Sequence, residues 1–352
     1  MRIIVTGGAG FIGSAVCRFL IGETDGTVLN VDKLTYAGNL DSLRPVAQHT
    51  RYRFTRADIC DQPAMEALFS DFRPDAVLHL AAESHVDRSI TGSSAFVNTN
   101  IVGSLTLLEA ARKHWAQVTG AERDGFRFVH VSTDEVYGSL GPVGLFKETS
   151  AYDPRSPYAA TKAAADHLVG AWHATYGFPA IIANCSNNYG PYHFPEKLIP
   201  LTIVNAIEGK ALPVYGDGSN VRDWVHVEDH ARALHCILCG GKPGQKYNVG
   251  ANNERTNIDV VTRICDCMDR LRPDGAPHRR LISYVADRPG HDRRYAIDAG
   301  KLRHELGWSP QIPFEEGIEA TVTWYLNNAW WWRPLREKYS GERLGMIDRR
   351  AE

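Results

Sequence analysis

The sequence contains no long apolar run. No stretch approaches the ~18 consecutive apolar residues of a membrane-spanning helix, and the first apolar run is interrupted after Val5 by Thr6 and Gly7, which makes it too short for a signal peptide. The chain also lacks an excess of one charge, because its net charge is −2 and both signs are mixed. We therefore expect neither a membrane nor a nucleic acid as partner.

Cysteine is scarce and odd in number. Seven cysteines in a chain of 352 residues do not indicate a disulfide framework. Cys236-x-x-Cys239 could be half of a zinc or redox site, but it lies inside an apolar pattern and no second pair stands at zinc spacing. We expect buried, reduced thiols, no metal, and a cytoplasmic compartment.

What the chain does contain is a regular alternation of strands and helices as far as residue 190. Apolar runs predict strands at residues 2–7, 27–32, 52–56, 76–82, 128–131 and 180–184, with helical patterns between them. One of these patterns predicts a continuous helix over residues 96–114, and a polar connection is expected over residues 119–125. This order predicts an α/β protein with a doubly wound parallel sheet, a Rossmann fold. Beyond residue 190 the segments become shorter, and helical patterns are expected at residues 198–208, 227–239, 258–271 and 314–326. We expect a first domain over residues 1–190 and a smaller, mainly substrate-binding mixed α/β domain over residues 191–352, with some segments returning to the sheet.

The first predicted strand leads directly into a glycine-rich turn. Gly8-x-Gly10-x-x-Gly13 fits the dinucleotide fingerprint, in which glycine lets the backbone approach a pyrophosphate and lets the helix pack on the strand. The N-terminus of the following helix offers free N–H groups to the phosphates. Asp32 ends the next strand, where a carboxylate can accept hydrogen bonds from a ribose and would repel a 2′-phosphate. The predicted cofactor is therefore NAD.

A second group of polar residues follows the strand predicted at residues 128–131. Ser132, Thr133, Asp134 and Glu135 leave this strand at its carboxyl end, where open α/β sheets bind ligands. Successive strand residues point to opposite faces, so both carboxylates can face one ligand only if the strand has already ended. A polar strand exit at the surface is the alternative interpretation.

Tyr158 and Lys162 begin a long predicted helix and share one of its faces. A cation close to a phenol favours the ionised form and lowers its pKa. Tyr158 could then take a proton from a substrate alcohol while hydride leaves for NAD, with Ser132 or Thr133 orienting that alcohol. The same spacing also occurs in plain surface helices, but the glycine turn and Asp32 favour catalysis.

These motifs resemble the extended short-chain dehydrogenase/reductases that act on nucleotide sugars, over almost the whole chain. Four longer segments narrow the resemblance to the dTDP-glucose 4,6-dehydratases within that family: residues 132–138, 184–191, 194–200 and 287–295. The resemblance implies dTDP-glucose as substrate, NAD as cofactor, an extended short-chain dehydrogenase type of Rossmann fold, and a homodimer joined through long helices.

The resemblance also assigns chemical roles to the carboxylate pair. Oxidation of the sugar at C4 makes the C5 proton acidic, so that Glu135 would remove this proton while Asp134 protonates the departing C6 hydroxyl. This elimination needs one ionised and one protonated carboxyl group. Return of the hydride to C6 would give the 4-keto-6-deoxy sugar nucleotide with no net use of NAD. The predicted catalytic set is Thr133, Asp134, Glu135, Tyr158 and Lys162.

Two binding sets are implied by the same resemblance. The cofactor set is Gly7, Gly10, Phe11, Ile12, Gly13, Asp32, Lys33, Thr35, Asp58, Ile59, Leu80, Ala81, Ala82, Ser84, Thr99, Ser132, Tyr158, Lys162, Cys185 and Asn188. The substrate set is Ser84, His85, Thr133, Asn187, Glu196, Lys197, Leu198, Pro213, Tyr215, Arg222, Asn257, Arg288, His291 and Tyr339. Arginine suits a diphosphate because it binds phosphate oxygens bidentately.

Two other functions stay open at this point. A UDP-sugar 4-epimerase or a nucleotide-sugar decarboxylase would share the fold but does not need a carboxylate pair at that strand exit. A silent NAD-binding regulator would need neither the carboxylates nor Tyr158 and Lys162. The run Trp330-Trp331-Trp332 either marks an interface or packs on its own chain.

Overall fold

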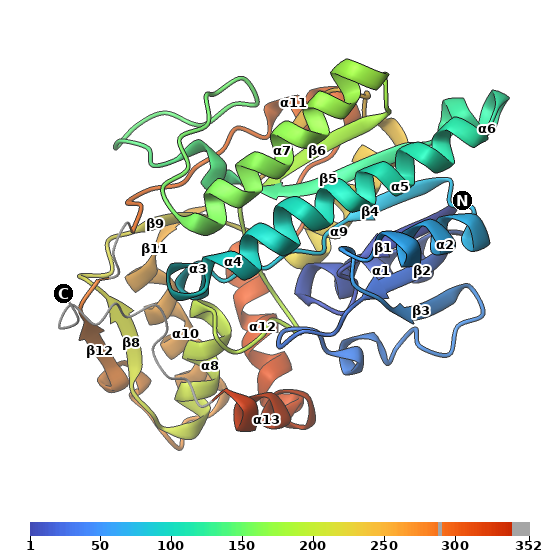
Figure 1. Ribbon diagram of the computed structural model, residues 1–352. Coiled ribbons are helices and arrows are strands. Elements are labelled where there is room, and N and C mark those ends of the chain that lie inside the picture. The colour runs from blue at the N-terminus through green and yellow to red at the C-terminus, as the bar shows by residue number, and fades with distance from the viewer. Residues whose placement is uncertain (288–290, 340–352) are drawn as a thin grey trace.

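The protein consists of a large parallel sheet between two layers of helices and a smaller region beside the carboxyl ends of its strands (Figure 1). The computed structural model describes residues 1–287 and 291–339. The strands are β1 (Arg2–Thr6), β2 (Thr27–Asp32), β3 (Tyr52–Arg56), β4 (Ala76–His79), β5 (Arg127–Thr133), β6 (Ala180–Cys185), β7 (Asn187–Tyr189), β8 (Leu212–Tyr215), β9 (Val221–His226), β10 (Lys246–Val249), β11 (Glu254–Thr256) and β12 (Ile282–Val285).

The helices connect these strands in the expected alternation. They are α1 (Phe11–Glu23), α2 (Gln62–Phe72), α3 (Val86–Thr91), α4 (Ser93–Phe96), α5 (Ser104–Gln117), α6 (Gly120–Gly125), α7 (Pro157–Tyr176), α8 (Leu198–Glu208), α9 (Val227–Gly240), α10 (Asn257–Leu271), α11 (Gly300–Leu306), α12 (Phe314–Asn327) and α13 (Ala329–Lys338). The 3₁₀ turns are η1 (Leu40–Leu43), η3 (Asp134–Tyr137) and η4 (His278–Leu281), and η2 (Val97–Gly103) is π-helical.

The seven-stranded sheet has the order β10-β6-β5-β4-β1-β2-β3, and all its neighbours are parallel. The predicted doubly wound parallel sheet is therefore confirmed. The strands predicted at residues 27–32 and 52–56 have those bounds, whereas the strand predicted to reach residue 82 ends at His79. β10 joins the sheet edge beside β6, which agrees with the expected return of later segments. The exact domain boundaries stay a prediction.

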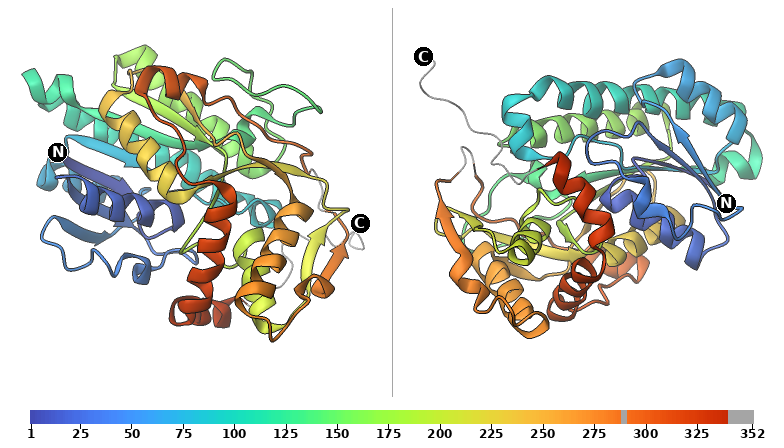
Figure 2. Two further views of the ribbon diagram at one scale, coloured as in Figure 1. Left: turned by 180° about the vertical axis from the view of Figure 1, so that it is seen from behind. Right: turned by 90° about the horizontal axis from the view of Figure 1, so that it is seen from below.

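Both faces of this sheet are buried. On one face Ile4, Val77 and Phe128 pack under α2, α5 and α7. On the other face Ile3 and Leu78 pack under α1, α9 and α11, as the views from behind and below show (Figure 2). A strand that is buried on both sides must be apolar at successive positions, and this is why these strands appear in the sequence as unbroken apolar runs.

The smaller region contains two short sheets. β9 pairs in parallel with β7 and antiparallel with β11, and β8 pairs in parallel with β12. Helices α8, α10, α12 and α13 surround a core that includes Phe314, Tyr325 and Trp331. The four helices predicted beyond residue 190, at 198–208, 227–239, 258–271 and 314–326, are present within one residue at each end.

Two stretches between β4 and β5 differ from the prediction. The continuous helix expected over residues 96–114 starts as the π-helical η2 and becomes regular in α5. The polar connection expected over residues 119–125 contains the short helix α6. α6 buries none of its residues, so it carries no apolar periodicity that a sequence pattern could reveal.

The tryptophan run packs on its own chain. Trp331 and Trp332 are buried, and the ring of Trp331 lies 5.3 Å from that of Trp324 and 5.5 Å from that of Tyr192. Trp330 is 42% exposed and lies under the guanidinium group of Arg44. Of the two interpretations, packing within the chain is confirmed for Trp331 and Trp332.

All seven cysteines are free. Cys17, Cys185, Cys265 and Cys267 are buried as predicted. The predicted burial was wrong for Cys60 and Cys236, which are half-buried, and for Cys239, which is exposed in the last turn of α9. Among the described residues no group of His, Cys, Asp and Glu is arranged to hold a metal ion. None of the helices described is both long enough and apolar enough to cross a membrane.

Candidate active site

One cavity lies at the carboxyl ends of β1, β2, β4, β5 and β6, between the large sheet and residues 193–197 of the smaller region. All five predicted catalytic residues line it, and so does every predicted cofactor residue except Asp58. From the predicted substrate set it is lined by Ser84, Thr133, Asn187, Glu196 and Lys197. The fold therefore brings the predicted catalytic residues and nearly all predicted cofactor residues to one place.

The glycine turn between β1 and α1 is shaped by close contacts. Gly7 has a positive φ of 72°, and a Cβ there would lie 2.6 Å from the backbone nitrogen of Ala81. A Cβ at Gly13 would lie 2.1 Å from the carbonyl oxygen of Gly7. Among the described residues, a Cβ at Gly10 would have one near contact, at 3.2 Å, so the missing side chain leaves room in the cavity. Gly10 precedes α1 without a side-chain cap, and the first N–H groups of α1 are open to an anion.

Asp32 closes the turn from the end of β2. Its carboxylate accepts hydrogen bonds from the backbone nitrogens of Leu34 at 2.7 Å and Ala9 at 3.0 Å. Burial raises its pKa, although these two hydrogen bonds oppose the effect. Asp58 does not line the cavity; it lies 3.4 Å from the Nζ of Lys33, which does. These residues, with the open turn at Gly10, fit a dinucleotide.

The end of β5 decides whether both carboxylates face the cavity. β5 ends at Thr133, and Asp134 begins the 3₁₀ turn η3. The Thr133 hydroxyl caps this turn by accepting a hydrogen bond from the Glu135 nitrogen at 3.3 Å, and it donates to Oδ1 of Asp134 at 3.3 Å. The strand alternation has therefore ended before the two acids, and both of them line the cavity.

The environment of Asp134 favours its neutral form. Asp134 is 2% exposed, and burial, followed by the charges of Glu135 and Asp223, raises its pKa well above the ordinary value, while Arg222 opposes the shift. Its Oδ2 atom is buried and has no hydrogen-bond partner in the described chain. Asp134 can therefore present a proton to a ligand in the cavity.

Tyr158 and Lys162 come from the first turns of α7. Ser156 caps this helix by accepting a hydrogen bond from the Ala159 nitrogen at 3.1 Å, and Pro157 starts it. Burial and then the charge of Glu135 raise the pKa of Tyr158, while a hydrogen bond with Thr133 opposes this shift. Both side chains are buried and border the cavity, as their spacing of four residues predicted.

Lys162 is directed toward β5. Its Nζ donates to the carbonyl oxygen of Val131 at 2.8 Å and lies 3.4 Å from Nε2 of His130. Burial lowers the pKa of this lysine, and the charge of Asp166 opposes that effect. Asp166, one helical turn further along α7, was absent from the predicted site.

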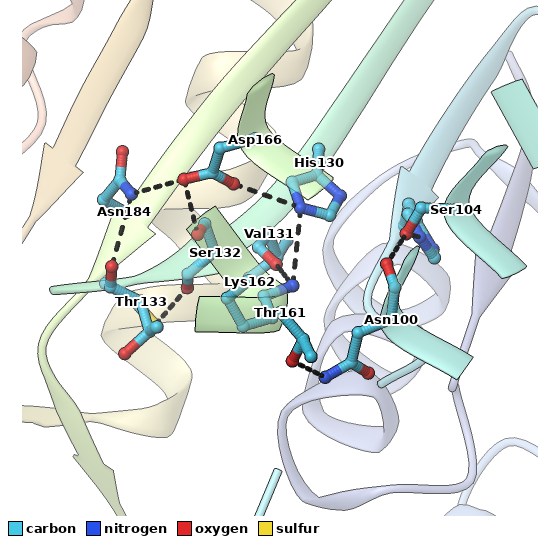
Figure 3. A network of polar contacts seen from close by, with 12 residues as sticks. Asn100, Ser104, His130, Val131, Ser132, Thr133, Thr161, Lys162, Asp166 and Asn184 are labelled. Atoms are coloured by element: carbon cyan, nitrogen blue, oxygen red, sulfur yellow. Dashed lines mark hydrogen bonds and ion pairs between the residues drawn. The ribbon is translucent and has the colours of Figure 1, made fainter. Parts of the chain in front are cut away.

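A buried polar network centred on Asp166 underlies these residues (Figure 3). Its Oδ2 accepts hydrogen bonds from Ser132 at 2.9 Å, Tyr152 at 2.8 Å and Asn184 at 3.3 Å. Because the Ser132 hydroxyl donates to Asp166, Thr133 is the better placed of the two candidates for orienting a substrate alcohol. The helical spacing Tyr158-Lys162-Asp166 was the signal in the sequence that could have identified this acid.

The other described residues of the predicted substrate set are not part of the cavity lining. The hydroxyl of Tyr215 lies 3.3 Å from Asp87, and Nδ1 of His291 lies 2.6 Å from Asp287. The guanidinium group of Arg222 donates to the Asp292 carbonyl oxygen at 2.9 Å. The others are buried or half-buried in neighbouring segments of the chain: His85, Leu198, Pro213, Asn257 and Tyr339. Arg288 lies outside the described residues. The roles of this whole group stay predictions.

The lining also includes residues that sequence reasoning missed. Glu83 and Ser186 border the cavity next to predicted residues, and His193 and Phe194 close it from the smaller region. The ring of His193 stacks on that of Phe11 with 4.0 Å between their centroids. His193 follows the segment NCSNNYGP closely, but nothing in its spacing placed it opposite the glycine turn.

The chain matches the model of the GDP-mannose 4,6 dehydratase family over residues 4–321. It belongs to this family. A curated relative, the probable dTDP-glucose 4,6-dehydratase of Sinorhizobium fredii, is 61% identical over 350 residues, which cover 99% of this chain and 100% of the relative. This membership agrees with the resemblance seen in the motifs.

Solved structures resemble the fold along nearly its whole length. The dTDP-glucose 4,6-dehydratase of Streptomyces venezuelae, crystallised with NAD and TYD bound, has a TM-score of 0.87 and 46% identity. The match covers 95% of this chain and 100% of the other. The UDP-glucose 4-epimerase of Thermus thermophilus, in complex with NAD, has a TM-score of 0.82 and 30% identity, covering 93% of this chain and 100% of the other. The dehydratase is thus the nearer of these two in sequence.

Proposed function

We propose that this protein is an NAD-dependent dTDP-glucose 4,6-dehydratase, a hydro-lyase that converts dTDP-glucose to dTDP-4-keto-6-deoxyglucose. The observation that carries the proposal is that two pairs of reactive side chains line one cavity. These are Tyr158 and Lys162 from α7, and the carboxyl groups of Asp134 and Glu135 from η3. The tyrosine–lysine pair suits oxidation of an alcohol, and the pair of carboxyl groups suits elimination of water. The high identity to dehydratases of this substrate supports the choice of sugar nucleotide.

The glycine turn, Asp32 and the ends of β4 to β6 would hold NAD. When bound, NAD supplies an acceptor for the hydride of C4 and returns it to C6. Asp32 would accept hydrogen bonds from the adenosine ribose, and the open N-terminus of α1 would face the pyrophosphate. Small side chains at Ala81 and Ala82, both on the cavity wall, leave space for a flat ring.

The first chemical step belongs to Tyr158. Thr133 orients the C4 hydroxyl, and Tyr158 takes its proton as the carbon is oxidised. Burial makes ionisation of the phenol unfavourable, so a neighbouring cation has to oppose that cost. Lys162, one turn further along the same helix, supplies this cation.

The second step belongs to the carboxylates. Glu135 removes the proton from C5, which the adjacent ketone has made acidic. Asp134, whose buried environment favours the protonated form, delivers its proton to the leaving C6 hydroxyl. The division of roles follows when neighbouring carboxyl groups are held in different protonation states, and Glu135 then returns a proton to C5.

The test is turnover of dTDP-glucose, measured by the base-induced absorbance of the 4-keto-6-deoxy product. Substrate labelled with deuterium at C4 should give product with the label at C6. Parallel assays with UDP-, GDP- and CDP-hexoses set the nucleobase preference. Lack of product at high enzyme concentration, or an epimer without loss of water, would reject the dehydratase in favour of a UDP-sugar 4-epimerase or decarboxylase.

The protein is also proposed to form a homodimer through α5 and α7, which lie side by side on one face of the sheet (Figure 1). Val97, Val102 and Leu105 on η2 and α5 are 46%, 42% and 38% exposed. On α7 the small residue Ala160 is exposed and allows close helix approach. Light scattering should give twice the monomer mass, and Val102→Glu with Leu105→Glu should give the monomer. A monomeric native protein would reject this interface.

The compartment is proposed to be the reducing cytoplasm. The seven free thiols, one of them exposed at Cys239, support this choice, since an oxidising compartment favours disulfides. Fractionation of the source cells followed by immunodetection tests it, and recovery of the protein outside the cytoplasmic fraction would reject it.

A further inference from the structure

Asp166 is a buried acid that neither predicted binding set contains. Asp166 lies four residues after Lys162 on α7, as Lys162 lies four after Tyr158, so the three side chains follow one stripe of the helix. Asp166 is 2% exposed and Lys162 is 4% exposed. A buried carboxylate and a buried ammonium group one turn apart require mutual compensation, because each alone carries a large desolvation cost.

The contacts of Asp166 Oδ2 are those of an ionised carboxylate, whereas Oδ1 has no hydrogen-bond partner among the described residues. Its Oδ2 accepts hydrogen bonds from Ser132, Tyr152 and Asn184, and its Oδ1 lies 3.3 Å from Nε2 of His130. Burial opposes ionisation, but hydrogen bonds and the charge of Lys162 lower the pKa of Asp166 below its ordinary value. Several donors on one oxygen leave no place for a proton there.

The other titratable groups that face Lys162 are neutral. Burial lowers the pKa of His130 on β5 to about 4 and that of His79 on β4 well below its ordinary value. Burial also raises the pKa of Cys185 on β6 to about 12 and that of Tyr158 on α7 above its ordinary value. Among the groups that the described chain places against Lys162, Asp166 therefore supplies the negative charge.

We propose that Asp166 is a positioning residue of the reaction: its carboxylate holds Lys162 as a cation beside Tyr158 and fixes the ends of β5 and β6 under the substrate. His130 links the two, since its Nε2 lies 3.3 Å from Asp166 Oδ1 and 3.4 Å from Lys162 Nζ. Asp166 does not reach the cavity itself and so acts through Lys162 and Ser132. The proposal rests on the proposed role of Lys162 in alcohol oxidation.

The direct test measures the protonation of Lys162 without any substrate. Competitive acetylation across a pH series, followed by peptide mass spectrometry, reports the neutral fraction of each lysine, with the exposed Lys242 as internal reference. The charge of Asp166 raises the pKa of Lys162, and loss of a nearby opposite charge lowers a lysine pKa by about one unit or more. Asp166→Asn should therefore raise the acetylation rate of Lys162 about tenfold near pH 8 and leave that of Lys242 unchanged. Equal rates in wild type and variant would overturn the proposal.

Activity gives a second readout with a defined sign. The alkaline limb of the kcat profile, where Lys162 loses its proton, should move to lower pH by about one unit in Asp166→Asn, with little change in KM. Asp166→Glu keeps the charge but misplaces it, so its maximal kcat should fall while the alkaline limb stays. Asp124→Asn, on the exposed part of α6, is the matched control and should behave as wild type. If the alkaline limb moved equally in Asp166→Asn and Asp166→Glu, the shift would come from altered geometry, and the proposed role of the Asp166 charge would be rejected.

If Asp166→Asn does not fold, acetylation of Lys162 in the wild-type protein still tests the proposal. Lys162 should be acetylated as a mostly protonated amine near pH 8 despite its burial. Acetylation as a free amine would overturn the proposal. Because acetylation needs no turnover, a protein that lacks dehydratase activity but shows the shift would separate failure of the proposed function from failure of this inference.

Discussion

Two buried carboxyl groups near the end of β5 favour opposite protonation states. Asp134 in η3 and Asp166 in α7 are both 2% exposed. The pKa of Asp134 is raised and that of Asp166 is lowered. Burial is therefore not what distinguishes them. The difference lies in their partners, and it lets one acid hold a proton for the substrate while the other holds a charge for the lysine.

The partners explain the two directions. Asp166 accepts hydrogen bonds from three side chains and faces His130 and Lys162. Among the described residues, Asp134 has one hydrogen-bond donor, Thr133, and two further carboxylates lie nearby, Glu135 and Asp223. A proton donor and a structural counter-charge can thus lie close together in one buried site. Three substitutions can break or sharpen this contrast.

The largest effect is expected for Asp134→Asn. The amide cannot deliver a proton to the departing hydroxyl, and a positioned general acid is worth ~10²–10⁴ in rate. We expect kcat to fall by about that factor, as measured by formation of the 4-keto-6-deoxy product. Asp124→Asn on exposed α6 should retain full activity. An Asp134→Asn enzyme within threefold of wild type would show that this acid is not the donor.

Much of this arrangement could be predicted because it depends on local sequence. Buried parallel strands such as β1 and β4 are apolar at successive positions, and the polar residues after β5 follow the rule that ligands bind at carboxyl ends. β5 ends before Asp134 because Thr133 caps η3. The sequence alone did not show where this strand ends.

The rest could not be predicted because it depends on distant segments. β9 lies between β7 and β11, so one small sheet draws strands from residues 187 to 256, and no local pattern sets that pairing. Asp166 was missed because an acid on a helix is usually solvated. Only the fold shows that Ser132 from β5, Asn184 from β6 and Tyr152 from a loop converge on it.

The second prediction concerns the free energy of unfolding of Asp166→Asn relative to wild type. Asp166→Asn should lower the free energy of unfolding by about 3 kcal/mol near neutral pH, because it leaves a buried cation without its partner. The lowered pKa of Asp166 gives stability above the unfolded pKa that is lost as pH falls. The difference from wild type should therefore shrink toward acid pH in urea titrations.

Asp134→Asn is the control for that experiment, because its effect on stability should depend on pH in the opposite direction. A raised pKa in the folded state gives stability that is present below the unfolded pKa and lost as pH rises. Near neutral pH the variant should be as stable as wild type or more stable, and this advantage should vanish in acid. A similar loss of stability in both variants would remove the contrast between the two acids.

The smallest effect is expected for Tyr152→Phe, which removes one donor from Asp166 and keeps its charge. The Tyr152 hydroxyl donates to Oδ2 at 2.8 Å, and hydrogen bonds to charged groups are worth about 1.5 kcal/mol or somewhat more. The ring still packs on Tyr137 and under Lys246. We expect a loss of about 1.5 kcal/mol in unfolding free energy and no movement of the alkaline limb of kcat, because Lys162 keeps its counter-charge. Tyr284→Phe, at a ring that is 60% exposed, should change neither quantity. A shift of the limb in Tyr152→Phe would mean that hydrogen-bond geometry, and not the charge of Asp166, sets the state of Lys162.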